Sequence, residues 1–182
     1  VIPLDLISSI YEEFYHPLID NNEKKSKARQ DGAYYTPPAL VEFVLSQTLT
    51  VKELKKNPRI LDPACGSGIF LVEAFRRMVR YEWHKQKKRP SFEYLKQIMQ
   101  DQIAGIEINE EAARITAFSL YLAMLHYLDP PSIKAQISQG NKLPNLLVNQ
   151  GSKSPNHIHC VWVGNTFNEA KIEVTPLLKK RF

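Results

Sequence analysis

The sequence lacks several features that would assign it to other classes of protein. Its two cysteines, Cys65 and Cys160, match no metal-site spacing, so it is neither a disulfide scaffold nor a zinc module. No apolar run is long enough to cross a membrane. Residues 1–5 have neither an initiator methionine nor the basic start of a signal peptide, so we expect a segment of a longer chain. These absences favour a cytoplasmic protein with reduced thiols, no metal and no membrane segment.

The composition supports one domain with a core of its own. The chain has 182 residues, of which 43% are hydrophobic. Lys and Arg number 24 against 19 for Asp and Glu, and the net charge of +5 is compatible with a nucleic-acid partner without identifying one. We divide the chain into an N-terminal helix and basic loop, residues 1–31, and a second part, residues 32–182.

The spacing of apolar residues predicts alternating helices and strands in the second part. Thr36 is expected to cap a helix that begins at Pro37, and Asn109 to cap a later helix. The basic residues 85–89 lie near a predicted helix end, where cations suit the helix dipole, so we do not assign them to DNA binding. The expected strands are residues 59–62, 103–107 and 158–163, and the other expected helices are residues 4–15, 67–89, 92–100 and 110–128.

The most informative segment is 60–70, which predicts a buried strand, a tight turn and the start of a helix. Pro63 closes the strand because it has no N–H to donate to a sheet. Gly66 and Gly68 allow positive φ angles and the close approach of a ligand to the backbone. A strand, a glycine turn and a helix start together predict a nucleotide-type site at the carboxyl edge of a parallel sheet.

This segment lacks the marks of the common phosphate-binding loops. Leu71 stands where the dinucleotide fingerprint needs a third Gly or Ala, and no Gly-Lys-Ser/Thr follows. Asp62, at the end of the strand, would repel a pyrophosphate. Its carboxylate suits a ligand that carries a cationic sulfonium and an ammonium group instead.

Three segments together resemble one known family. Asp62–Gly68, Asp-Pro-Ala-Cys-Gly-Ser-Gly, is similar to the S-adenosylmethionine (SAM) loop of the N6-adenine-specific DNA methyltransferases of restriction–modification systems. Gly32–Pro37 resembles the motif that precedes this loop in the family, and Ala104–Asn109 resembles the acidic strand end that follows it. The resemblance implies an α/β, Rossmann-like SAM-dependent methyltransferase fold, here the first half of a mostly parallel sheet with an N-terminal helical segment.

The resemblance also implies a role for each matching residue. The loop supplies backbone groups around the methionine part of SAM, and Glu107 accepts hydrogen bonds from the ribose hydroxyls. Ile108 packs on the adenine, whereas Tyr34 either packs on the cofactor or belongs to the core. Thr36 and Pro37 contact the methionine carboxylate at a helix start. The predicted cofactor-binding residues are Tyr34, Thr36, Pro37, Asp62, Ala64, Gly66, Ser67, Gly68, Glu107, Ile108, Asn165 and Thr166.

No catalytic residue is assigned. The catalytic turn of the family is Asn or Asp, two prolines and an aromatic residue, which hold the flipped adenine. Asp129–Ser132, Asp-Pro-Pro-Ser, lacks the aromatic and follows a predicted helix, so we interpret it as a helix stop. Val163–Phe167 ends a strand in Gly-Asn but has neither proline. The chain ends at Phe182, about where the strand before the catalytic turn should begin, so we expect it to be inactive alone.

The sequence therefore predicts a SAM-binding fragment of a site-specific adenine-N6 DNA methyltransferase, which acts on double-stranded DNA as the full-length protein. Two alternatives stay open. One is a SAM-dependent methyltransferase acting on RNA, protein or a small molecule, and the other is a non-catalytic SAM-binding module. We also expect self-association of the isolated chain, because the edge of strand 59–62 would lack its neighbour.

Overall fold

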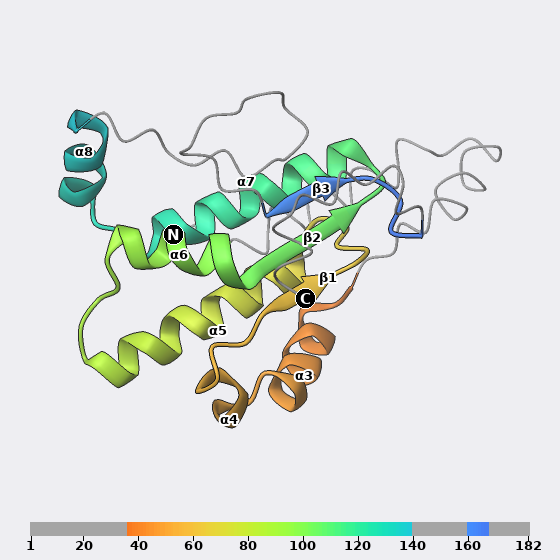
Figure 1. Ribbon diagram of the computed structural model, residues 1–182, viewed down its shortest axis with the longest axis horizontal. Coiled ribbons are helices and arrows are strands. Elements are labelled where there is room, and N and C mark those ends of the chain that lie inside the picture. Colours follow the sequence, from red (N-terminus) through yellow and green to blue (C-terminus); the bar gives the residue numbers. More distant parts are fainter. Residues whose placement is uncertain (1–35, 140–159, 168–182) are drawn as a thin grey trace.

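The computed structural model describes residues 36–139 and 160–167 as helices packed around a small parallel sheet (Figure 1). The predicted helix 4–15 and Tyr34 lie outside the described residues, and the division at residue 31 stays a prediction. In chain order the elements are α3 (Pro38–Thr48), α4 (Val51–Leu54), β1 (Ile60–Asp62), α5 (Ile69–Gln86), α6 (Phe92–Gln102), β2 (Ile103–Glu107), α7 (Glu110–His126), α8 (Pro130–Ser138) and β3 (Val161–Val163).

The sheet has three strands in the order β1-β2-β3, and both pairings are parallel. Ile60 of β1 is in register with Ile103 of β2, and Glu107 of β2 is in register with Val163 of β3. All carboxyl ends therefore point to one edge of the sheet. An α/β fold with a parallel sheet is confirmed, and β2 has the predicted bounds. Among the described strands β1 pairs only with β2, so the expected self-association along its other edge stays a prediction.

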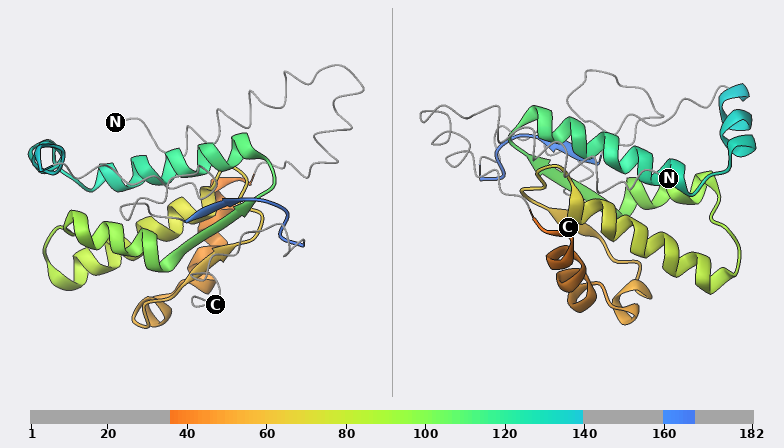
Figure 2. Two further views of the ribbon diagram at one scale, coloured as in Figure 1. Left: turned by 45° about the horizontal axis from the view of Figure 1, so that its top comes forward. Right: turned by 180° about the vertical axis from the view of Figure 1, so that it is seen from behind.

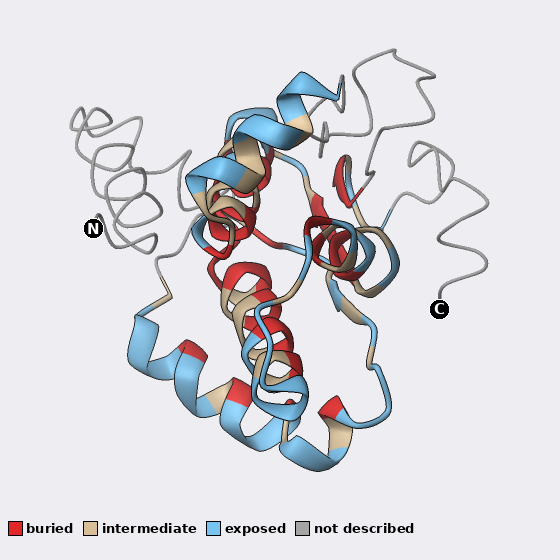
Figure 3. Ribbon diagram, turned by 90° about the vertical axis from the view of Figure 1, so that its left-hand side faces the viewer, coloured by how far each residue is buried: buried red, intermediate tan, exposed pale blue. Residues whose placement is uncertain are grey.

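The helix α5 lies between α3 and α7 and contacts both of them. This arrangement can be followed in Figure 1 and, from behind, in the right-hand view of Figure 2. The helix α5 contacts β1, β2 and α6 as well, which makes it the centre of the packing. Buried positions gather on the inner sides of α5 and α7, whereas α3 is mostly exposed (Figure 3). Burial on one stripe is what the apolar spacing of α5 predicts.

The buried stripe of α5 includes Leu71, Phe75 and Val79, each 0% exposed. Phe75 meets the ring of Tyr127 edge-on, with the ring centroids 6.2 Å apart. Tyr127 follows the last residue of α7, so this contact joins the first half of α5 to the end of α7. Aromatic pairs of this kind contribute roughly 0.5–1.5 kcal/mol beyond their buried area.

Several predicted helix boundaries are wrong. The helix α5 begins at Ile69 rather than residue 67, α6 ends at Gln102 rather than residue 100, and α7 ends at His126 rather than residue 128. Pro37, not Thr36, is the N-cap residue of α3, and it is followed by Pro38 as the first helical residue. No side chain caps this helix, because proline offers no acceptor and its own ring already sets the φ angle that a helix start needs. The helix α5 ends at Gln86 rather than residue 89, because Lys87 adopts a left-handed conformation with φ 52°.

The segment Asp129–Ser132 begins a helix instead of merely ending one. The carboxylate of Asp129 accepts hydrogen bonds from the Ser132 N–H at 2.8 Å and from the Ser132 hydroxyl at 2.9 Å. This is an N-cap with prolines in the first turn, and it starts α8. Neither α8 nor the short α4, which Thr50 caps, was predicted from the sequence.

Among the described residues, no helix combines the length and the apolar character that crossing a membrane requires.

Candidate cofactor-binding site

The glycine loop, residues 62–68, joins the carboxyl end of β1 to the start of α5 (Figure 1). Gly66 has φ 54° and Gly68 has φ 87°, both in the left-handed region that favours glycine. Gly68 is the N-cap residue of α5, and its carbonyl accepts the first helical hydrogen bond, from Val72 at 2.9 Å. The two glycines thus turn the chain from strand to helix at the carboxyl edge of the sheet.

The loop packs tightly against two other elements. A Cβ on Gly68 would lie 2.6 Å from Cγ2 of Thr116 on α7. A Cβ on Gly105 of β2 would lie 2.6 Å from Leu71 and 3.0 Å from the sulfur of Cys65. The positions of these glycines are therefore set by close approach as well as by backbone conformation.

Glu107, at the end of β2, joins two of the sequence motifs. One carboxylate oxygen accepts a hydrogen bond from the Gly66 N–H at 2.8 Å, although the two residues are 41 positions apart. The other oxygen accepts from the Asn109 N–H at 2.8 Å. Because a carboxylate offers about four acceptor positions, each oxygen keeps one for another donor. Glu107 is thus held in place at the loop and still able to accept hydrogen bonds.

Asp62 places a second carboxylate at this edge. Its Oδ1 accepts a hydrogen bond from the Ala64 N–H at 3.2 Å. Desolvation by burial raises the pKa of Asp62 above its ordinary value, the Ala64 hydrogen bond partly offsets this rise, and the charge of Glu107 adds to it. Two carboxylates so close together disfavour a phosphate ligand and favour a cation or a donor of hydrogen bonds.

Removing the Asp62 charge should stabilise the ligand-free fold. Folding raises the pKa of Asp62, so the folded state disfavours the ionised carboxylate. The ionised group therefore lowers the free energy of unfolding at neutral pH. This cost falls as the pH drops through the folded-state pKa, because the carboxyl becomes protonated. Asp62→Asn, which keeps an acceptor for Ala64, should therefore raise the free energy of unfolding at pH 7, and the gain should disappear near pH 3. Urea unfolding at both pH values measures this.

Asp129→Asn is the control of opposite sign for that prediction. Hydrogen bonds from Ser132 lower the pKa of Asp129, so its charge supports the fold at neutral pH. This variant should lose stability at pH 7 and less at low pH. If Asp62→Asn also loses stability at pH 7, the carboxylate of Asp62 is better satisfied than its burial indicates.

The turn after β3 reaches the same edge of the sheet. The N–H of Gly164 donates to the carbonyl of Glu107 at 2.8 Å, and the hydroxyl of Thr166 donates to the carbonyl of Pro63. The Asn165 side chain accepts from the Phe167 N–H at 2.9 Å, within its own turn. Asn165 and Thr166 are therefore brought to the predicted site, and their contact with adenine stays a prediction.

Two apolar side chains are exposed in the segments that follow β2 and β3. Ile108 is 60% exposed and Phe167 is 97% exposed, following β2 and β3 respectively. Exposed apolar side chains at this edge suit a flat ring better than an ion. Sequence reasoning assigned Ile108 to the site and did not assign Phe167.

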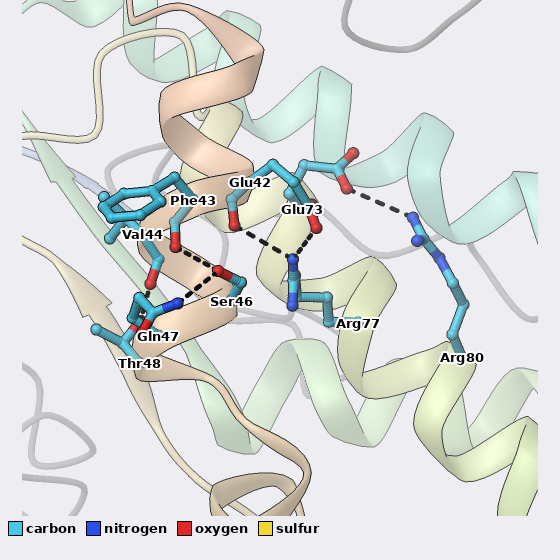
Figure 4. Close-up of polar contacts among 9 residues, drawn as sticks. All are labelled: Glu42, Phe43, Val44, Ser46, Gln47, Thr48, Glu73, Arg77 and Arg80. Atoms are coloured by element: carbon cyan, nitrogen blue, oxygen red, sulfur yellow. Dashed lines mark hydrogen bonds and ion pairs between the residues drawn. The ribbon is translucent and has the colours of Figure 1, made fainter.

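The start of α3 lies next to the glycine loop, where both views agree (Figures 1 and 2). Arg77 of α5 holds α3 in this position through an ion pair with Glu42 and a 3.4 Å hydrogen bond to its carbonyl (Figure 4). Thr36 is half-buried and Pro37 is exposed at this helix start. Thr36 and Pro37, the two described residues of the motif at 32–37, are thus close to the loop, and their contact with a ligand stays a prediction.

Several other candidates are not part of the site. Cys65 is buried, and burial raises the pKa of its thiol, so it is an inert packing residue as predicted. The basic residues 85–89 lie at the far end of α5, about 27 Å from the loop for a helix of 18 residues. Asp129 lies on α8, at the opposite end of the molecule from the loop (Figure 1). No described group of His, Cys, Asp or Glu could hold a metal ion.

Thr116, which sequence reasoning did not assign to the site, is buried at 0% exposure on α7. Its hydroxyl donates to the carbonyl of Gly66 at 2.7 Å. A polar side chain at an inward position of an apolar helix was the only signal, since buried polar groups almost always have a partner. The partner itself could not be read from the sequence.

A glycine loop after one parallel strand and a carboxylate after the next, meeting at the carboxyl edge, are the arrangement typical of domains that bind a nucleoside-type cofactor. The family model for the MmeI DNA-methyltransferase domain matches residues 44–169, more than half of the chain, and the chain belongs to this family. The resemblance to the adenine methyltransferases of restriction–modification systems is thereby confirmed.

Two relatives show how the chain compares with whole proteins. It is 33% identical over 93 residues to the adenine-specific methyltransferase PglX of Streptomyces coelicolor, a match covering 50% of this chain and 8% of that protein. It is 26% identical over 153 residues to the type I restriction enzyme MjaVII methylase subunit of Methanocaldococcus jannaschii, covering 83% of this chain and 22% of that subunit. The chain thus spans less than a quarter of the length of either.

Proposed function

We propose that this chain binds SAM at the carboxyl edge of β1, β2 and β3. The observation that carries the proposal is the carboxylate of Glu107, fixed by the N–H groups of Gly66 and Asn109 with acceptor positions left over. Paired ribose hydroxyls are the donors that such a carboxylate would take. When bound, SAM supplies a methyl group that its sulfonium makes ready for transfer.

The chain's own groups divide the remaining work of binding. The carboxylate of Asp62 and the loop backbone face the charged methionine part. The start of α3, with Thr36 and Pro37, favours the methionine carboxylate. Ile108 and Phe167 cover the adenine faces and keep water from them. Asp62 is destabilising without a ligand, and a cationic group beside it would remove that cost.

We further propose that the full-length protein transfers the methyl group to the N6 atom of adenine in double-stranded DNA, within a restriction–modification system. The relatives named above are an adenine-specific methyltransferase and a restriction enzyme's methylase subunit. A cytoplasmic location follows from such a substrate, and the two buried free thiols suit it. No described residue is placed as catalytic, so the chain alone is proposed to bind and not to transfer.

Titration calorimetry with SAM, S-adenosylhomocysteine and NAD tests the binding proposal. We expect binding of the first two ligands and none of NAD, because the two carboxylates disfavour a pyrophosphate. A folded chain that binds neither SAM nor S-adenosylhomocysteine would refute it.

Transfer of a labelled methyl group by the full-length protein tests the reaction. Double-stranded DNA of many sequence contexts should be labelled at adenine, whereas the isolated chain should label nothing. Labelling of RNA or protein instead would support the alternative of a SAM-dependent methyltransferase with a substrate other than DNA. Binding of SAM by a full-length protein that labels no substrate would support a non-catalytic module.

A further inference from the structure

We propose that Thr116 is a positioning residue that holds the glycine loop in the conformation required for cofactor binding. The inference rests on the proposed SAM site. The hydroxyl of Thr116 donates to the carbonyl of Gly66, with 2.7 Å between the oxygens, and the side chain is fully buried on α7. It is distant in sequence from the loop, and the matched motifs do not include it.

The hydrogen bonds on both sides of Gly66 give this contact its importance. The N–H of Gly66 donates to Glu107 at 2.8 Å, and its carbonyl accepts from Thr116. The first bond fixes the peptide before Gly66, and the second fixes the peptide after it. Glycine has more backbone freedom than any other residue, so a left-handed glycine between two anchored peptides cannot rotate to other conformations.

The methyl group of Thr116 adds a steric constraint to the same loop. Its Cγ2 would be 2.6 Å from a Cβ on Gly68, and its Oγ1 lies 3.9 Å from the sulfur of Cys65. One side chain therefore contacts the loop at three of its residues. The hydroxyl and the methyl have separate tasks, since one orients a peptide and the other fills space.

The helix α7 connects Thr116 to Glu107, the carboxylate that is proposed to bind the ribose hydroxyls. Asn109 caps α7 with its side chain, which accepts from Glu111 at 2.9 Å, while its own N–H donates to Glu107. The N-cap residue of α7 thus bonds to Glu107 at the end of β2, and Thr116 lies further along the same helix. Thr116 keeps the loop at a fixed position relative to Glu107, so that the loop backbone and the Glu107 carboxylate can contact the same ligand.

The test compares three variants of α7. Thr116→Val removes the hydroxyl and keeps the shape, Thr116→Ser keeps the hydroxyl and removes the methyl, and Ser119→Ala is the matched control. Ser119 is also fully buried on α7, and its hydroxyl has no hydrogen-bond partner within the described part of the chain. The readouts are S-adenosylhomocysteine affinity by calorimetry and amide hydrogen exchange of residues 66–68 in the ligand-free chain.

We expect Thr116→Val to weaken S-adenosylhomocysteine binding about tenfold, the scale for leaving one buried acceptor unsatisfied, and to speed exchange in the loop. Thr116→Ser should keep both affinity and protection close to wild type, and Ser119→Ala should change neither. Equal affinities for the valine and serine variants, or an equal loss in Ser119→Ala, would overturn the proposal. A wild-type chain that binds no ligand would refute the proposed function, and the exchange data alone would then decide whether Thr116 holds the loop.

Discussion

Gly68→Ala is expected to destabilise the chain by roughly 2–5 kcal/mol, the sum of left-handed backbone strain and a steric clash. The backbone contribution arises because Gly68 has φ 87°. The clash arises because the new Cβ would meet three atoms of Thr116 at 2.6–3.0 Å, and Thr116 is itself fully buried. Urea unfolding followed by circular dichroism measures the loss.

Gly66→Ala is the control that separates the two contributions. Gly66 has φ 54°, but nothing lies within 4 Å of a Cβ built there, so only the backbone strain applies. Its loss should be smaller than that of Gly68→Ala. Adding Thr116→Ala to Gly68→Ala removes two of the clashing atoms and should recover part of the stability. An equal loss of unfolding free energy in Gly66→Ala and Gly68→Ala would show that α7 shifts to make room for the new methyl group.

Glu107→Ala is expected to weaken SAM binding by roughly 1–3 kcal/mol, the usual scale for losing hydrogen bonds to a charged group. At about 1.4 kcal/mol for each tenfold change in affinity, this corresponds to a loss of roughly 5–150-fold. The variant loses the acceptor for the ribose hydroxyls, and it also releases the N–H groups of Gly66 and Asn109. Calorimetry with SAM and with S-adenosylhomocysteine measures the effect.

Glu110→Ala is the matched control, since Glu110 is an exposed carboxylate near Glu107 that forms an ion pair with Arg114 on the surface of α7. It should leave the affinity unchanged. Glu107→Gln distinguishes charge from geometry, because the amide keeps one acceptor oxygen and loses the charge. An affinity for SAM in Glu107→Ala equal to that of the wild type would remove Glu107 from the site.

The site was predictable in its parts because each part has a local pattern. The cap at Asn109 needs only a short polar side chain before a run of helix formers, and it accepts from Glu111 and Ala112 as such caps do. The strand Ile103–Glu107 is a short apolar run with a helix on each side, and its bounds were predicted correctly. The same reasoning failed for Thr36 and Asp129, where prolines beside a polar residue allow more than one helix boundary.

The sequence by itself determined the class of this protein: a glycine loop after one strand, a carboxylate after the next, and a core large enough for an α/β domain. These features depend on backbone conformation and on apolar periodicity, which act over a few neighbouring residues. Only the tertiary structure decided that Glu107 bonds to Gly66 and that Thr116 anchors the loop from α7. Those contacts join residues 41 and 50 positions apart, and they form because parallel strand pairing and the packing of α5 on α7 bring them together.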